Sequence, residues 1–167
     1  MFAALDNIQA AGLIGLAHGG QSWQEYILFL AMLAHVGGTD LYLKVLRDRD
    51  PRAINSDAFK QVLVNFKRLQ GYVDAGAPGR NWNDATALLI SGKGGVQFMG
   101  DWAKGEFTSA GQSAGKEYGC LTGFGANAPF LIQGDAFIFP KTDKAETLKA
   151  QKLLGSVMVA PATQLEF

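Results

Sequence analysis

The chain has 167 residues, of which 48% are hydrophobic and 18% are charged, which suits one globular domain with a buried core. Fifteen basic and fifteen acidic side chains balance. This balance excludes the basic surface of a nucleic-acid-binding protein and the cationic helix of a membrane-surface protein. Cys120 is the only cysteine, so an intrachain disulfide and a cysteine metal cluster are excluded as well.

The first part of the chain alternates between helix and strand patterns. Residues 2–11 are predicted to form a helix that Gly12 closes. The apolar run LIGLA at 13–17 predicts a short buried strand. The segment YILFLAMLAHV at 26–36 is expected to be helical and apolar on nearly every face, and Gly37–Gly38 are expected to stop it.

The middle of the chain predicts an amphipathic helix with Ser56 or Asn55 as its N-cap. The residues of its apolar stripe recur at steps of three and four: Phe59, Val62, Leu63, Phe66, Leu69 and Val73. Further strands are expected in VQFMG (96–100), YGCLTGFG (118–125) and APFLIQGDAFIFP (128–140). A last helix is predicted to begin near Lys144 and to kink or end at Pro161. Strands that alternate with helices predict a sheet with helices on its faces.

Targeting signals and membrane spans are not expected. The opening residues MFAALDNIQAAG lack the charged start of a signal peptide. No segment approaches the roughly eighteen uncharged apolar residues that a membrane-spanning helix needs.

Several kinds of catalytic and metal site are not supported by the sequence. His18 and His35 have no ligand-spaced partners, so no metal site is expected. The run GKGG lacks the G-x-x-x-x-G-K-[ST] spacing of a phosphate loop, and no G-x-S-x-G motif occurs. Cys120 is expected to be a packed core thiol. We therefore predict no catalytic residues, no cofactor and no enzymatic activity.

Pairs of aromatic and carboxylate side chains are the chemically distinctive feature. Asp101 and Trp102 follow the apolar run VQFMG, and Asp135 interrupts the run FLIQGDAFIF. A sugar presents hydroxyls for a carboxylate and a C–H face for an aromatic ring, and ligands of α/β proteins bind beyond the carboxyl ends of the strands. Two plainer roles stay open: Asp101 as the N-cap of a helix that begins at Trp102, and Trp102 as a core residue.

Three segments together closely resemble the sugar-binding proteins of bacterial ABC importers, in particular the glucose and mannose binders. They are AAGLIGLAHGGQSWQE, GYVDAGAPGRNWNDA and GKGGVQFMGDWAKGEF. Members of that family are periplasmic or lipid-anchored and close two lobes around one sugar. The resemblance implies that residues 1–167 form a single domain, most of the second, C-terminal lobe. It also implies a three-layer α/β/α fold of the type II periplasmic-binding-protein kind, with a central, mostly parallel sheet.

The resemblance also implies a ligand site and partners. Trp102 would stack on a monosaccharide such as glucose or mannose, and Asp135 would accept hydrogen bonds from its hydroxyls, with Gln133 and Asp101 nearby. The partner of the intact protein would be the membrane permease of an ABC importer. The family commonly has Asn-x-Asp-Ser where this chain has Gln133-Gly134-Asp135-Ala136. We therefore expect the chain alone to bind sugar weakly or not at all.

An alternative interpretation treats the chain as a stand-alone scaffold without a ligand. The helix 26–36 is more apolar than its counterpart in the family, and the chain begins within a helix and stops before the family's lysine segment. Tyr26, Leu30 and Leu33 share one helical stripe. On this hypothesis the chain is an excised or redesigned lobe that folds alone or forms a homodimer through that stripe.

Overall fold

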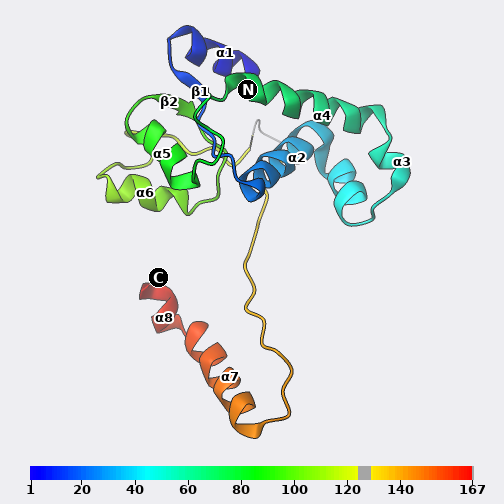
Figure 1. Ribbon diagram of the computed structural model, residues 1–167, viewed down its shortest axis with the longest axis vertical. Helices are drawn as coiled ribbons and strands as arrows, with labels where there is room; N and C mark the ends of the chain where they lie inside the picture. Colours follow the sequence, from blue (N-terminus) through cyan, green and yellow to red (C-terminus); the bar gives the residue numbers. More distant parts are fainter. Residues whose placement is uncertain (124–128, 167) are drawn as a thin grey trace. The chain divides into compact units, whose positions relative to one another are not determined.

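The computed structural model describes residues 1–123 and 129–166. The chain divides into two compact units, Met1–Leu131 and Ile132–Phe167. The first contains the sheet and the helices from α1 to α6, and the second contains α7 and α8 (Figure 1).

A short parallel sheet lies at one end of the first unit. Its strands β1 (Ile14–Leu16) and β2 (Gly94–Val96) pair with Ile14 opposite Gly94. Helix α1 (Phe2–Ala10) packs on this sheet so closely that a Cβ at Gly95 would stand 2.6 Å from Ile8 Cδ1. The predicted strand at 13–17 is confirmed. The second predicted strand, 96–100, is only partly confirmed, because β2 covers residues 94–96 and residues 97–100 form no strand. The glycines at its start, which the sequence assigned to a loop, leave room for α1 to pack against the strand backbone.

Helix α2 (Ser22–Leu46) is the long central helix of this unit. Gly38, with φ 73° and ψ 175°, interrupts it, so the expected stop at Gly37–Gly38 is a break after which the helix resumes. By length and composition α2 is apolar enough to cross a membrane, which the sequence reading did not anticipate. In this structure Leu28 and Met32 lie in the core, and α2 packs along α4.

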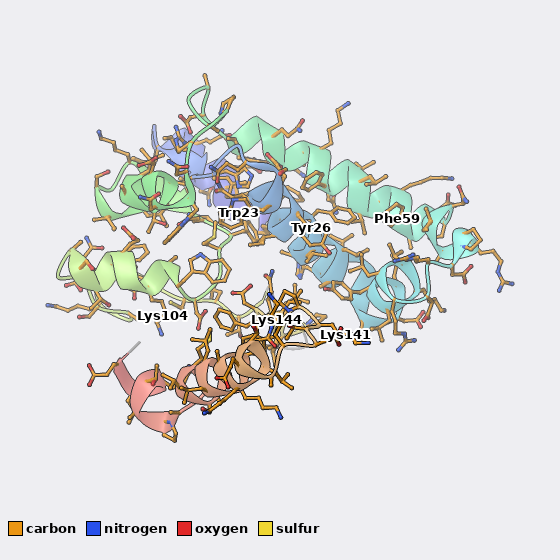
Figure 2. All side chains as sticks on the ribbon, turned by 60° about the horizontal axis from the view of Figure 1, so that its bottom comes forward. Trp23, Tyr26, Phe59, Lys104, Lys141 and Lys144 are labelled. Carbon is orange, nitrogen blue, oxygen red and sulfur yellow. The ribbon has the colours of Figure 1, made fainter. Side chains whose placement is uncertain are left out.

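Helix α4 (Asp57–Leu69) covers α2 (Figure 2). The Ser56 hydroxyl accepts a hydrogen bond from the Phe59 amide at 3.2 Å, which confirms the predicted N-cap. Two rings of α4, Phe59 and Phe66, stand edge-on to Phe29 of α2 at centroid distances of 6.3 and 5.8 Å. Leu63 is exposed, so it does not belong to the buried stripe, although the sequence pattern includes it.

The shorter elements complete the first unit. Helix α3 (Pro51–Ile54) precedes α4, and a 3-10 turn η1 (Gln70–Tyr72) follows it. Helices α5 (Trp82–Ile90) and α6 (Ala103–Ser109) pack against each other. The α/β fold class is therefore confirmed, with helices packed around a small parallel sheet.

The strands expected near the carboxyl end do not form among the described residues. Residues 129–144 contain no strand, and residues 118–123 contribute only an isolated bridge between Tyr118 and Ala114; residues 124–128 of the two predicted strands lie outside the described part. An apolar run becomes a strand only when a neighbouring strand takes up its backbone hydrogen bonds. Cys120 is exposed, so the predicted core thiol is wrong.

The second unit is mainly helical. Helix α7 (Ala145–Met158) starts where the sequence predicted its last helix. Helix α8 (Pro161–Glu166) begins with the proline that was expected to kink or end that helix. Both predictions are confirmed.

Candidate functional site

Two half-exposed indole rings form the most distinctive surface feature of the first unit. Trp23 and Trp102 are 38% and 42% exposed, and their ring centroids lie 6.5 Å apart with planes inclined by 50°. Trp23 lies in the first turn of α2 (Figure 2). Trp102 directly precedes α6. We call these two residues the indole pair. The alternative of Trp102 as a core residue is wrong.

The sheet explains why these two tryptophans meet. Trp23 follows the carboxyl end of β1 and Trp102 follows the carboxyl end of β2, and the two strands are parallel neighbours. Segments that leave parallel strands at their carboxyl ends emerge at the same edge of the sheet. Sequence reasoning found Trp102 and missed Trp23, although the order strand, His-Gly-Gly loop, Trp23 carried the same signal.

Hydrogen bonds fix the orientation of Trp23. Its Nε1 donates to Gln21 Oε1 at 2.8 Å, and Gln21 Nε2 donates to Asn81 Oδ1 at 2.8 Å. The fully buried Gln24 donates its Nε2 to the same Gln21 oxygen at 3.1 Å. Gln21 therefore links Trp23 to the start of α5 and holds the ring in one position.

Trp102 lies directly over Gly100. A Cβ on Gly100 would stand 2.2 Å from Cζ3 of the Trp102 indole, so the ring reaches its position only because this residue lacks a side chain. Asp101 does not cap α6: Trp102 occupies the N-cap position without a side-chain cap, and the Asp101 carbonyl accepts from the Lys104 amide at 2.9 Å. The predicted capping role is wrong because α6 starts one residue later than expected. The Asp101 side chain is exposed.

A Gly100→Ala variant is expected to move the Trp102 ring with little loss of global stability. The three heavy atoms nearest to the added methyl group all belong to the half-exposed indole, which can turn away into solvent. We expect the tryptophan fluorescence to shift toward that of a hydrated indole. The unfolding free energy measured in urea should change by less than about 1 kcal/mol. An unchanged emission spectrum would show that the ring does not depend on Gly100.

The loop of residues 74–80 is held by a partly buried ion pair. Arg80 donates from Nη1 to Asp74 Oδ1 at 2.7 Å and from Nη2 to Asp74 Oδ2 at 2.5 Å. Arg80 Nη1 also donates to the His18 carbonyl at 3.1 Å, and the Arg80 carbonyl accepts from Gln24 Nε2 at 3.3 Å. These contacts tie residues 74–80 to the His-Gly-Gly loop that precedes the indole pair. The hydrogen bonds from Arg80 lower the pKa of the Asp74 carboxyl below its ordinary value of 3.8.

An Asp74→Asn variant is expected to lose about 2 kcal/mol of stability at pH 7, because a charged hydrogen-bond acceptor is removed from Arg80. Since the folded-state pKa is depressed, this stabilisation is fully present above the unfolded pKa and disappears as the pH falls through the folded value. Urea unfolding should therefore show a gap between wild type and variant at pH 7 that closes in strong acid. Exposed Asp143→Asn serves as the control, and a gap that persists unchanged in strong acid contradicts the assignment.

The other predicted site residues are placed as follows. Gln133 and Asp135 are exposed in the second unit, and their action together with Trp102 stays a prediction.

Leu33 is fully buried in the core of its own chain, so its predicted place in an interface is wrong. Leu30 is half-buried and Tyr26 is 51% exposed. A homodimer through Tyr26 stays a prediction. Within the described ranges, no three His, Cys, Asp or Glu side chains gather where they could hold a metal ion.

Known proteins resemble this chain over nearly its whole length. The family model of bacterial extracellular solute-binding proteins matches residues 2–161. The probable sugar-binding periplasmic protein of Brucella suis biovar 1 (strain 1330) is 41% identical over 167 residues, which are 100% of this chain and 39% of that protein. The corresponding protein of Mesorhizobium japonicum is 42% identical over 166 residues, 99% of this chain and 39% of that protein.

A solved structure agrees in fold. The bacterial solute receptor AcbH, described as having an exclusive preference for β-D-galactopyranose, superimposes with a TM-score of 0.56. The match is 24% identical and covers 63% of this chain and 27% of that one. The chain spans about 39% of the length of the curated relatives named above. It belongs to the family of bacterial extracellular solute-binding proteins.

Proposed function

We propose that the indole pair is the sugar-contacting surface of this chain, which acts as one carbohydrate-binding lobe of a solute-binding protein. The observation that carries the proposal is the meeting of two half-exposed indoles beyond the carboxyl ends of both strands. The names of the relatives, probable sugar-binding periplasmic proteins, support the same ligand class.

The chemistry of the surface suits a monosaccharide. An indole face offers a large apolar area to the C–H groups of a pyranose ring, and it loses little conformational entropy because the side chain has only two torsions. Exposed carboxylates such as Asp101 accept hydrogen bonds from sugar hydroxyls. Asp135 and Gln133 are proposed to add polar contacts of the same kind, and glucose or mannose is the proposed sugar.

One lobe should hold the sugar only weakly. The chain corresponds to 39% of the length of its relatives, and each hydrogen bond to a charged group that is missing costs about 1.5–3 kcal/mol. The dissociation constant should therefore be about 1 mM or higher, which corresponds to a binding free energy of about −4 kcal/mol or weaker. The intact protein is proposed to be periplasmic, to deliver its sugar to the membrane permease of an ABC importer and to carry out no catalysis.

Ligand-observed saturation-transfer NMR tests this function. Glucose, mannose and galactose should each receive magnetisation from the chain, strongest at the ring C–H protons that face the indoles. Glycerol, which has hydroxyls and no pyranose ring, is the matched control. Equal transfer to glycerol and to all three sugars, or no transfer to any of them, would refute carbohydrate binding by this surface.

A further inference from the structure

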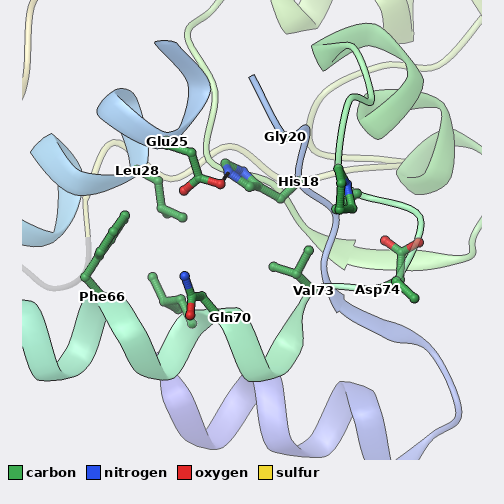
Figure 3. A pocket seen from close by; sticks show the side chains of 12 residues that line it. His18, Gly20, Glu25, Leu28, Phe66, Gln70, Val73 and Asp74 are labelled. Carbon is green, nitrogen blue, oxygen red and sulfur yellow. Dashed lines mark ion pairs between the residues drawn. The ribbon is translucent and has the colours of Figure 1, made fainter. Parts of the chain in front are cut away.

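A cavity of about 490 Å³ lies beside α2 (Figure 3). Its apolar wall combines residues of α2, α4 and the loop that follows η1: Leu28, Phe66, Leu69, Val73, Ala77 and Pro78. Trp23 and Glu25 are two residues apart on α2, which places them about 200° apart around the helix. The cavity is thus separate from the surface proposed to contact sugar, and its size falls within the range of small-molecule sites.

A buried histidine lines this cavity and contacts Glu25. His18 is 3% exposed, and its Nδ1 has no hydrogen-bond partner in the described part of the chain. Its Nε2 stands 3.2 Å from Glu25 Oε1, which is an ion-pair distance, but the ring N–H is not aligned for a hydrogen bond. A buried polar atom without a partner costs free energy. The contact between His18 and Glu25 places the Glu25 carboxylate at the cavity wall.

The charges around the cavity determine the sign of the charge that a bound ligand should carry. Glu25 and Asp74 are both in the lining, which contains no lysine or arginine. Asp74 is neutralised by its two hydrogen bonds with Arg80, so Glu25, whose side chain is 46% exposed, supplies the negative charge that remains. An anion would therefore be repelled, and a cation would be attracted.

The ring of Phe66 is suited to a cation with an apolar body. It lines the cavity, and Phe29 holds it edge-on at a centroid distance of 5.8 Å. Aromatic faces attract ammonium groups, and Leu28 and Leu69 add apolar surface beside the ring.

We propose that this cavity binds a small organic ammonium ion. Its N–H groups donate to the Glu25 carboxylate, and its hydrocarbon part packs against Phe66 and the two leucines. The ligand thereby neutralises Glu25 through a charge-assisted hydrogen bond.

Calorimetry with three probes of similar shape tests the proposal on the intact chain. Benzylammonium should bind at least about tenfold more tightly than benzyl alcohol, because only the former makes a charge-assisted hydrogen bond with Glu25. Phenylacetate should not bind. Equal affinity for benzylammonium and benzyl alcohol, or a preference for phenylacetate, overturns the proposal.

Two further measurements locate the binding site. Glu25→Gln should abolish the tenfold advantage of benzylammonium, whereas Glu146→Gln on the exposed face of α7 should leave it unchanged. In the wild-type chain, the ¹⁵N resonances of His18 should move on addition of benzylammonium, and those of His35 should not. A Glu25→Gln variant that keeps the advantage, or His18 resonances that do not move, would contradict the assignment.

Discussion

A Gly20→Ala variant is expected to lose about 3 kcal/mol of unfolding free energy, at the upper end of what overpacking costs. A Cβ at Gly20 would stand 2.6 Å from the Ala77 carbonyl oxygen and 2.7 Å from the Gly79 amide nitrogen. Both are backbone atoms, and Arg80 and Asp74 hold their loop in place. Backbone atoms, unlike a flexible side chain, cannot rotate away from the added methyl group. The methyl group must therefore displace the loop itself. Urea denaturation followed by circular dichroism measures the loss.

Gly105→Ala is the matched control for this prediction. Gly105 lies within α6 and has no heavy atom within 4 Å of the position a Cβ would take. Alanine there removes the poor helix propensity of glycine and should stabilise the chain by up to about 1 kcal/mol. If both variants changed stability by the same amount, the close approach of the two loops would not be a structural constraint.

A Trp102→Ala variant is expected to weaken sugar binding by at least about tenfold, since it removes the ring on which the pyranose would stack. The indole is already 42% exposed and lies beside Gly100 and Trp23. Its loss should therefore cost little of the core. Titration of the variant with glucose, followed by saturation-transfer amplitudes, measures the change.

Tyr26→Ala provides the comparison for the loss of an exposed aromatic ring. Tyr26 is 51% exposed on α2, three residues beyond Trp23, and the proposal gives it no sugar contact. Its removal should leave the saturation-transfer amplitudes unchanged. Sugar binding that survived in Trp102→Ala and fell in Tyr26→Ala would place the ligand elsewhere on α2.

Local signals in the sequence predicted the helices well. The three- and four-residue spacing of α4 and the Ser56 hydroxyl that caps it are contained within one short segment. Pro161 likewise marks the start of α8 by its own covalent geometry. The strands were harder to predict, because pairing depends on a neighbour that is distant in sequence. The apolar run at 130–139 has the composition of a strand and forms none in this structure.

The candidate site was only partly predictable for the same reason. Trp102 stood out because a carboxylate precedes it and a strand pattern comes before both. Trp23 also follows a strand pattern but has no carboxylate directly before it, and its partnership with Trp102 follows from the parallel register of β1 and β2. The sequence presents His18 only as a possible metal ligand, because its burial and its contact with Glu25 depend on the fold and not on residue spacing.

Indole resonances give the most direct test of sugar contact by the indole pair. The chain contains three tryptophans, Trp23, Trp82 and Trp102, so each Nε1–H gives its own signal in a ¹H–¹⁵N spectrum. During titration with glucose, the signals of Trp23 and Trp102 should shift together along one binding curve, while Trp82, at the start of α5, stays in place. A spectrum in which the first two signals do not move, or in which Trp82 alone responds, would contradict the account.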